Sequence, residues 1–445
     1  MRTPIYDFVQ NYIQSNTARF HMPGHKGVPH LGCEPMDITE IGGADVLYAP
    51  HGIIAESEAN VTELFCTAHT FYSTEGSSLA IRAMLALVRE GATTPLILAA
   101  RNAHKAFLYA CALLDLDVEW LYPDQSEHIC KAVITPKALS SKLQSMDVKP
   151  CAVYMTSPDY LGNIADIAAL SLICKQYDIP LLVDNAHGAY LRFLAPSLHP
   201  ISLGATACCD SAHKTLPVLT GGAYLHISNE APDKYLLNAR KYLSLFASTS
   251  PSYLILQSLD LCNAYVASDY QTRLSFCLKH VSDTKEYIRS RGFCVLDGEP
   301  LKIVIHASMS GFTGEELAQV LSEYRIECEF TDPDFLVLMA STENGPEDFE
   351  RLKQAFSSIA PRSPIPQYVP KLPQSCMIFS PRKAILAPSE TLSLDAAAGR
   401  VCASPTVACP PAVPIVMSGE EITEEHIRVM RYYGYKHIDV IKSEG

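Results

Sequence analysis

The sequence predicts an α/β fold with a mostly parallel sheet that is covered on both faces. Two observations between about residues 69 and 228 lead to this prediction. Short runs that are apolar throughout recur along the chain, and stretches with apolar residues at helical spacing separate several of them. Strands of this kind are buried on both faces, and helices that alternate with them provide the crossovers of a parallel sheet.

The predicted elements follow in a regular order. A short apolar run at residues 68–72 precedes a helix at residues 77–89. The predicted strands after this helix are 95–100 (PLILAA), 151–156 (CAVYMT), 180–184 (PLLVD), 205–209 (ATACC) and 223–227 (AYLHI). The predicted helices among these strands are 104–114, 137–146 and 167–177.

A smaller α/β pattern follows. Residues 252–291 have a helical pattern, and then strands at 301–306 and 335–339 alternate with helices at 314–324 and 346–359. Residues 361–374 are rich in proline, which interrupts helices and strands, so we expect a boundary or linker there. We expect four domains, namely an N-terminal arm (1–60), a large domain (61–295), a small α/β domain (296–362) and a C-terminal domain (363–445).

Charge and hydropathy disfavour several classes of protein. The 445 residues carry a formal net charge of −13 at pH 7, whereas a nucleic-acid partner would require a basic surface. No stretch approaches about 18 consecutive apolar residues, so we expect no membrane-spanning helix. Residues 1–16 lack the apolar core of a signal peptide. We therefore expect a cytoplasmic protein.

The cysteines predict reduced thiols. The chain has 15 of them, an odd number, and they are scattered without any C-x-x-C pair. This pattern fits buried, unpaired thiols in a reducing compartment better than a disulfide framework or a zinc site. We expect no metal site.

Polar residues follow two of the predicted strands. Asp184 ends an apolar strand, where an unpaired carboxylate is costly, so we expect it to meet a cation or a protonated nitrogen. Asp210, Ser211, His213 and Lys214 follow the next strand. Ligands of parallel sheets bind beyond the carboxyl ends of the strands. We therefore expect Asp184 and Lys214 to share one site.

A candidate anion site lies at the start of the helix at residues 77–89. Gly76, Ser77 and Ser78 stand where free backbone N–H groups, the helix dipole and two hydroxyls favour an anion. A serine that only caps the helix is the alternative. The sequence contains neither a Walker loop nor a G-x-G-x-x-G that opens a helix.

These groups match the needs of pyridoxal phosphate. This cofactor requires a lysine amine, an acid beside its pyridine nitrogen, a phosphate site and a flat group over its ring. Lys214, Asp184 and the candidate anion site supply the first three. Ser211 and His213 stand beside Lys214 and would reach the phosphate. The fourth group is His104, at the start of the helix that follows strand 95–100.

Longer motifs resemble one family. They are FHMPGHKG (20–27), MDITEIGGADVL (36–47), RNAHK (101–105), VDNAHGAY (183–190), SAHKTLPVLTGGAYLH (211–226) and PPAVPIVMSGEEIT (410–423). In this order they resemble the bacterial ornithine/lysine/arginine decarboxylases, which are pyridoxal-phosphate enzymes of the aspartate-aminotransferase fold. The chain is similar to their short form, without the N-terminal receiver-like domain. It departs from the usual residues of the family at residues 74–78 (TEGSS), Ala106, Asn185, Gly221 and Ser418.

The resemblance implies a fold-type-I large domain with a mostly parallel seven-stranded sheet, followed by smaller α/β domains. It implies that Lys214 forms the Schiff base, that Asp184 pairs with the pyridine nitrogen and that His104 stacks on the ring. The residues implied to bind the cofactor are Gly76, Ser77, Ser78, His104, Asp184, Ala186, His187, Ser211, His213 and Lys214.

The implied reaction is the decarboxylation of a basic amino acid to an amine and CO2, which would feed polyamine metabolism. Lysine, arginine and ornithine all remain open as the substrate. Lys214 or His213 is the candidate acid that returns a proton to Cα. Glu420 or Glu421 is a candidate partner for the distal cation of the substrate, with an exposed acidic helix start as the alternative.

Two other functions remain open from the residues alone. One is a different fold-type-I enzyme, such as an aminotransferase or an aldolase-type lyase. The other is a catalytically inactive homologue, although the presence of both Lys214 and Asp184 argues against it.

The resemblance also implies a homodimer or a dimer of dimers, with the active site at the subunit interface. HMPGHKG lies in an arm with too few apolar residues for its own core, so we expect the arm to dock on a partner or on the large domain. The larger rings of the long-form enzymes are not expected. We expect no partner among nucleic acids or membranes.

Overall fold

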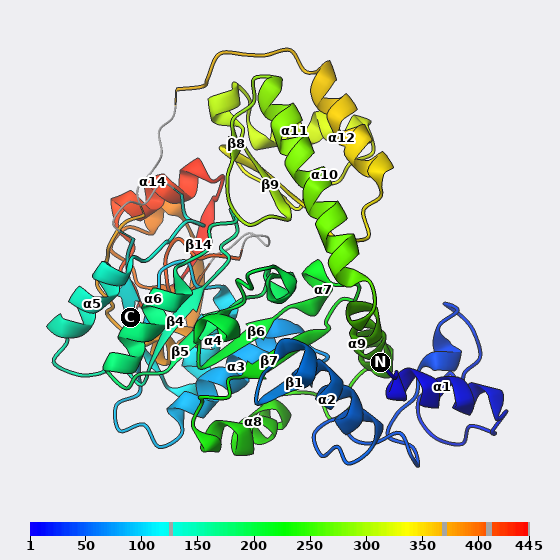
Figure 1. The fold of residues 1–445 in the computed structure, drawn as a ribbon. Coiled ribbons are helices and arrows are strands. Elements are labelled where there is room, and N and C mark those ends of the chain that lie inside the picture. Colours follow the sequence, from blue (N-terminus) through cyan, green and yellow to red (C-terminus); the bar gives the residue numbers. More distant parts are fainter. Residues whose placement is uncertain (124–127, 367–371, 406–411, 444–445) are drawn as a thin grey trace. The chain divides into compact units, whose positions relative to one another are not determined.

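The computed structural model describes residues 1–123, 128–366, 372–405 and 412–443. The chain divides into two compact units, each made of two stretches of sequence. Unit 1 contains Met1–Ala92 and Ile167–Thr272, and unit 2 contains Thr93–Asp166 and Arg273–Gly445. Each unit is described by itself below, with the elements labelled as in Figure 1.

Unit 1 contains four strands of the main sheet, in the order β1-β7-β6-β5. Their bounds are β1 (His69–Ser73), β5 (Leu181–Asp184), β6 (Ala207–Asp210) and β7 (Ala223–Ile227). Strands β5 and β6 are parallel, whereas β7 is antiparallel to both β6 and β1. The carboxyl ends of β1, β5 and β6 therefore lie at the same edge of the sheet.

The helices of unit 1 pack on this sheet and on one another. They are α1 (Pro4–Gln14), α2 (Ile53–Phe65), α3 (Gly76–Arg89), α6 (Ile167–Gln176), α7 (Ala212–Thr215), α8 (Asp233–Phe246) and α9 (Tyr253–Ala267), with 3-10 turns η1 (Glu34–Met36), η2 (Ala189–Phe193) and η3 (Pro200–Leu203). Helix α3 lies against β6, β7 and α8, and α2 lies against β1 and α9. Leucine, alanine and methionine side chains make most of the buried face of α3.

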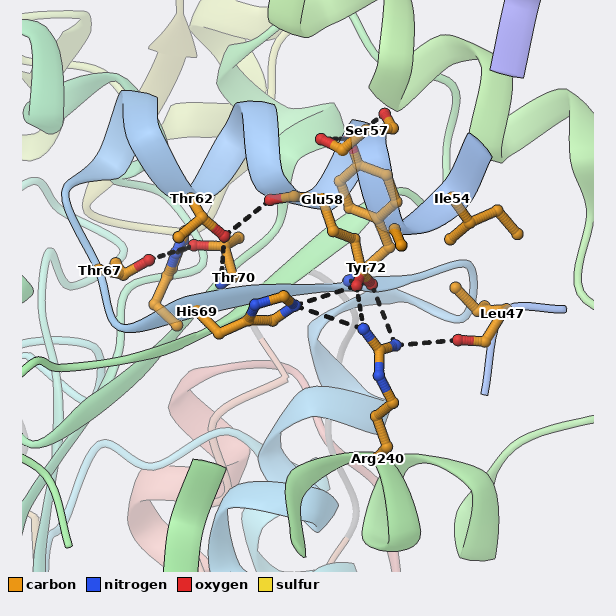
Figure 2. Close-up of polar contacts among 12 residues, drawn as sticks. Leu47, Ile54, Ser57, Glu58, Thr62, Thr67, His69, Thr70, Tyr72 and Arg240 are labelled. Carbon is orange, nitrogen blue, oxygen red and sulfur yellow. Dashed lines mark hydrogen bonds and ion pairs between the residues drawn. The ribbon is translucent and has the colours of Figure 1, made fainter. Parts of the chain in front are cut away.

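An ion pair with a buried carboxylate connects α2 to its surroundings (Figure 2). The carboxylate of Glu58 has no exposed surface and accepts hydrogen bonds from Arg240 of α8 and from the backbone N–H of Tyr72. The Nε2 atom of His69 lies 3.1 Å from the same carboxylate. Arg240 also donates to the carbonyl of Leu47, at 3.0 Å. A buried charge requires such partners, and these ones join α2, β1, α8 and the preceding loop.

Helix α1 receives its cap from a distant residue. Its own N-cap residue, Thr3, makes no side-chain capping bond. Instead, Oδ2 of Asp260 in α9 accepts the backbone N–H groups of Ile5 and Tyr6 at 2.9 and 3.0 Å. The other carboxylate oxygen accepts from Ser57, at 2.5 Å. The carboxylate thus satisfies two of the N–H groups that every helix start leaves open.

Unit 2 contains three parallel strands of the main sheet and two smaller sheets. The parallel strands lie in the order β4-β2-β3, with β2 (Leu96–Ala100), β3 (Asp117–Leu121) and β4 (Ala152–Thr156). Helices α4 (Lys105–Leu114) and α5 (Pro136–Ser145) belong to this part. The main sheet thus has seven strands in total, so the expected mostly parallel seven-stranded α/β fold is confirmed.

The four-stranded sheet of unit 2 has the order β10-β11-β9-β8. Its strands are β8 (Val295–Leu296), β9 (Lys302–His306), β10 (Phe330–Thr331) and β11 (Phe335–Met339). Helix α10 (Tyr270–Ser290) precedes these strands in sequence, and α12 (Pro346–Ser358) follows them. The turn η4 (Ser308–Ser310) and helix α11 (Gly314–Glu323) lie between β9 and β10 in sequence.

The three-stranded sheet of unit 2 has the order β12-β14-β13. Its elements are α13 (Pro381–Ile385), β12 (Ser389–Ser393), η5 (Leu394–Ala396), β13 (Cys402–Ser404), α14 (Glu424–Tyr432) and β14 (His437–Ile441). These strands and α14 contribute to a core with Phe335 and Val337 of β11.

The expected strands and helices are confirmed to within about two residues at each end, and several elements were not expected. Strand β3 was not predicted, because Asp117 and Glu119 alternate with its buried residues and the run is not apolar throughout. Residues 367–371 of the expected linker lie outside the described residues, as do Pro410 and Pro411. The four expected domain boundaries stay predictions. No helix in the described ranges is both long and apolar enough to span a membrane.

Candidate active site

The predicted site residues of unit 1 gather at one edge of its strands. Asp184 is the last residue of β5, and Ser211 directly follows β6. Lys214 belongs to the short helix α7 that comes next. Helix α3 starts three residues after the end of β1. Since β1, β5 and β6 end at the same edge, the fold brings together three segments that are far apart in sequence.

Lys214 has a histidine partner. Its Nζ atom lies 2.7 Å from Nε2 of His187, in the loop that follows β5. His187 is buried, and Lys214 is partly exposed. The imidazole thus lies against the amine at the carboxyl end of the strands.

Asp184 is a buried carboxylate. Its Oδ1 atom accepts the backbone N–H of Ala186 at 3.2 Å, and the thiol of Cys209 lies 3.6 Å from the same atom. Cys209 is the partner of Asp184 in the pairing of β5 with β6. These contacts orient the carboxylate, and its burial strengthens its interaction with any cation that it meets.

The start of α3 fits an anion. Its N-cap residue is Glu75, which makes no capping hydrogen bond, so the alternative of a simple serine cap is wrong. Gly76 has a φ of +70°, which glycine adopts without strain, and donates its N–H to the carbonyl of Gly221. The hydroxyl of Ser211 lies 2.9 Å from that of Ser77. Two hydroxyls therefore lie close together at an uncapped helix N-terminus.

His213 has a defined tautomer. Its Nδ1 atom lies 2.9 Å from the carbonyl oxygen of Gly222, which can only accept, so Nδ1 carries the proton. Burial, together with the charge of the adjacent Lys214, lowers the pKa of His213 below its ordinary value. The ring is therefore neutral at pH 7, with an acceptor at Nε2.

The other predicted site residues belong to unit 2. His104 is the N-cap of α4, and its Nδ1 atom accepts the N–H of Ala106. Glu420 has no exposed surface, and its carboxylate lies 3.2 Å from the guanidinium of Arg101 and accepts the N–H of Met417. Glu421 is exposed. The ion pair of Glu420 weighs against its proposed contact with substrate, whereas Glu421 offers an accessible carboxylate.

Sequence reasoning missed three contributors to these arrangements. Cys209 was grouped with the other thiols, although its position in the strand after β5 could have placed it beside Asp184. Gly222 lies in the motif at residues 211–226 without a predicted role, and its carbonyl accepts a hydrogen bond from His213. Arg101 lies in the motif at residues 101–105 without a predicted role. The sequence does not indicate that its partner is Glu420.

The residues of unit 1 fit pyridoxal phosphate. The uncapped start of α3 with Ser77 and Ser211 suits a phosphate, and Lys214 offers the amine. Asp184 is a buried carboxylate at the same edge, which suits a protonated ring nitrogen.

Comparisons with known proteins agree with this chemistry. Residues 3–346 match the major domain of the Orn/Lys/Arg decarboxylases, and residues 373–437 match the C-terminal domain of the same family. The chain is 29% identical to an arginine decarboxylase of Halalkalibacterium halodurans, over 97% of this chain and 93% of the relative. It is 28% identical to an arginine decarboxylase of Bacillus subtilis, over 98% and 94% of the two chains. The solved constitutive lysine decarboxylase of Escherichia coli aligns with a TM-score of 0.79 at 17% identity, over 99% of this chain and 82% of that one.

Proposed function

The chain belongs to the Orn/Lys/Arg decarboxylase family, whose members are pyridoxal-phosphate-dependent carboxy-lyases, and on this premise we propose that it decarboxylates arginine or another basic amino acid. The fold is aspartate-aminotransferase-like, as the sequence resemblance implied. Arginine is placed first because relatives that are 28% and 29% identical over nearly the whole chain are named arginine decarboxylases. Lysine and ornithine are the other candidates.

One observation supports the proposal more than any other. Lys214, with His187 at 2.7 Å, stands at the same strand edge as the buried Asp184. A nucleophilic amine and a buried carboxylate at one edge are the two protein groups on which this cofactor depends. An inactive homologue would have no use for a lysine and a buried carboxylate at the same strand edge.

Each residue has a defined task in this proposal. The bound cofactor supplies the electron sink for the pair released when the bond between Cα and the carboxylate breaks. Lys214 holds the cofactor covalently, and Asp184 keeps the ring nitrogen protonated. Ser77, Ser211 and the start of α3 bind the phosphate. The family resemblance alone assigns His104 to the face of the ring, and His187 orients the amine of Lys214.

The proton that returns to Cα has two candidate donors. Lys214 carries protons on Nζ and is held at a fixed place by His187. His213 is neutral at pH 7, because burial lowers its pKa, and its one ring proton is bound to the carbonyl of Gly222. These contacts favour Lys214 as the donor.

The substrate cation requires a carboxylate. We place Glu421 in this role, because it is exposed whereas Glu420 is paired with Arg101 in the interior of unit 2. The guanidinium of arginine can form a bidentate pair with a carboxylate. Glu421→Gln should therefore raise KM for arginine more than it lowers kcat.

The N-terminal arm supports an assembly of at least two copies. Phe20 and Leu31 are 97% and 90% exposed, and Met22 and Val28 are exposed beside them in sequence. Large apolar side chains that cluster at the surface of one chain usually meet a partner. We propose a homodimer or a dimer of dimers, with the arm docked on the second copy.

We also propose a cytoplasmic location and a role in polyamine supply. A cytoplasmic location is supported by the cysteines, since all 14 in the described part of the chain are free thiols. A role in polyamine supply follows from the chemistry of the product, because decarboxylation of a basic amino acid yields a diamine or its guanidino analogue.

Product analysis tests this proposal against its rivals. The purified protein, supplied with the cofactor, is incubated separately with arginine, lysine and ornithine, and CO2, amines and keto acids are measured. Equal amounts of CO2 and the matching amine are expected from one of the three substrates. A keto acid without CO2 would indicate an aminotransferase, and no product from any of the three would contradict the proposal.

A further inference from the structure

Four side chains of metal-ligating type lie together in unit 1, apart from the site described above. They are His199, Cys208, Asp210 and His226, and none has any exposed surface. One ligand atom from each residue lies within 4.8 Å of the ligand atoms of all the others. The cluster includes two imidazoles, one thiol and one carboxylate.

The strand geometry places the cluster on the face of β6 opposite to Asp184. Successive side chains of a strand point to opposite faces, so Cys208 and Asp210 share one face and Cys209 occupies the other. Cys209 contacts Asp184. His226 of β7 is paired with Cys208 in the sheet and lies on the same face as the cluster. His199 is the residue directly before η3.

The ligand atoms lie slightly closer together or slightly further apart than the ligands of a tetrahedral ion, and two of the contacts are hydrogen bonds. Nε2 of His199 and Nε2 of His226 lie 3.0 and 3.1 Å from Oδ2 of Asp210. The sulfur of Cys208 lies 3.9 Å from Nε2 of His199. Ligands bound about 2.0–2.3 Å from a tetrahedral zinc are separated from one another by roughly 3.3–3.8 Å. Small shifts would bring the four atoms to that spacing.

Charge gives a second, independent argument. Asp210 is fully buried, and its ion pairs within the described part of the chain are with the two imidazoles. A buried carboxylate is costly unless a cation compensates its charge. A divalent cation bound by Asp210 and by the thiolate of Cys208 makes the cluster neutral, since the thiol gives up its proton on binding.

Neighbouring polar groups form hydrogen bonds with two of the proposed ligands, as is common around protein-bound metal ions. Nδ1 of His226 lies 2.8 Å from the hydroxyl of Thr70, which in turn lies 2.8 Å from that of Thr67. The other carboxylate oxygen of Asp210 accepts from Nδ2 of Asn185 at 2.7 Å. Such second contacts fix the orientation of a histidine or carboxylate ligand and strengthen binding.

We propose that His199, Cys208, Asp210 and His226 bind a zinc ion with a structural role. Two nitrogens, one sulfur and one oxygen form a ligand set suited to zinc, and four protein ligands leave no open position for catalysis. The ion would join β6, β7 and the start of η3. Sequence analysis led us to expect no metal, because the spacing 199, 208, 210, 226 matches no linear motif.

Metal analysis of the cofactor-loaded protein tests the proposal without reference to its activity. The protein is purified under reducing conditions without chelator, and zinc is measured by mass spectrometry after gel filtration. Stoichiometric zinc is expected. Replacement by Co2+ should give intense visible bands of tetrahedral cobalt and a near-ultraviolet thiolate band. Folded protein that holds no zinc, and takes up neither Zn2+ nor Co2+ on refolding, would overturn the proposal.

Three variants locate the ion. Cys208→Ser should lose the thiolate band of the cobalt form, whereas Cys174→Ser, which changes a buried thiol in α6, should keep it. Thr70→Val removes the partner of His226 and should weaken zinc binding about 10–100-fold. A folded Cys208→Ser protein with an unchanged thiolate band, or unchanged zinc affinity in Thr70→Val, would contradict the assigned ligands.

Discussion

The Nζ atom of Lys214 lies 2.7 Å from Nε2 of His187, although the two residues come from different segments of unit 1. His187 belongs to the loop after β5, and Lys214 belongs to α7 after β6. Parallel pairing of β5 with β6 puts these two segments side by side. The sheet thus holds the amine at a fixed place near the buried Asp184, and the proposed chemistry depends on this arrangement.

Replacement of Asp184 should impair catalysis far more than cofactor binding. Asp184→Ala removes the carboxylate that keeps the ring nitrogen protonated, whereas the phosphate site remains. We expect kcat to fall at least about a hundredfold, which corresponds to about 3 kcal/mol of barrier at ~1.4 kcal/mol per tenfold. Steady-state kinetics and cofactor titration measure the two effects. Asp233→Ala, which replaces an exposed aspartate in the same unit, is the control. A near-normal kcat in Asp184→Ala would show that Asp184 does not belong to the site.

Loss of the paired hydroxyls should weaken cofactor binding. Ser77→Ala and Ser211→Ala each remove a donor to the phosphate, and a hydrogen bond to a charged group contributes about 1.5–3 kcal/mol. The dissociation constant of pyridoxal phosphate should therefore rise roughly 10–100-fold, while kcat at saturating cofactor changes little. Fluorescence titration of the apoenzyme gives the constant. Ser202→Ala, on the surface of unit 1, should bind the cofactor normally, and a normal constant in both site variants would place the phosphate elsewhere.

The strand ends of the site could be predicted from sequence, and its packing could not. Fully apolar strands located Asp184 and Lys214 at one edge, because the direction of parallel strands follows from the alternation with helices. The pairing of Glu420 with Arg101 depends on contacts between residues more than 300 positions apart, which no local pattern reports. For the same reason the cluster around Asp210 could not be predicted, because its four residues come together only when β6, β7 and η3 pack.

Asp260 should make the stability of unit 1 depend on pH. Burial raises its pKa from 3.8 to about 6, so the folded chain binds this proton more tightly than the unfolded chain does. The free energy of unfolding should therefore fall as the pH rises from about 4 to about 6, and level off above, with a contribution of about 3 kcal/mol at ~1.4 kcal/mol per pKa unit.

Asp260→Asn keeps an acceptor for the N–H groups of Ile5 and Tyr6 but cannot ionise. Denaturant unfolding at about pH 4 and at about pH 6, for both proteins, isolates the effect. The variant should show a smaller loss of stability between these two values. An equal loss in both proteins would mean that Asp260 does not titrate in this range.

The exposed arm should hold two copies together. Phe20→Asp and Leu31→Asp place charges on side chains that are almost fully exposed in one chain, so they should not disturb its own core. They should shift the assembly towards the 48.8 kDa monomer and reduce activity in parallel. Light scattering of active protein measures this. Wild-type protein that is fully active as a monomer would contradict the shared site, and the decameric rings of long-form relatives would contradict the expectation that this chain does not form them.

The central claim is that Lys214 holds pyridoxal phosphate for decarboxylation, and borohydride reduction followed by peptide mass spectrometry tests it most directly. Reduction fixes the cofactor to the amine that it occupies. The account predicts a yellow protein in which the label is found on the peptide containing Lys214, and a Lys214→Ala protein that carries no label and releases no CO2. A label on another lysine, or full turnover in Lys214→Ala, would contradict it.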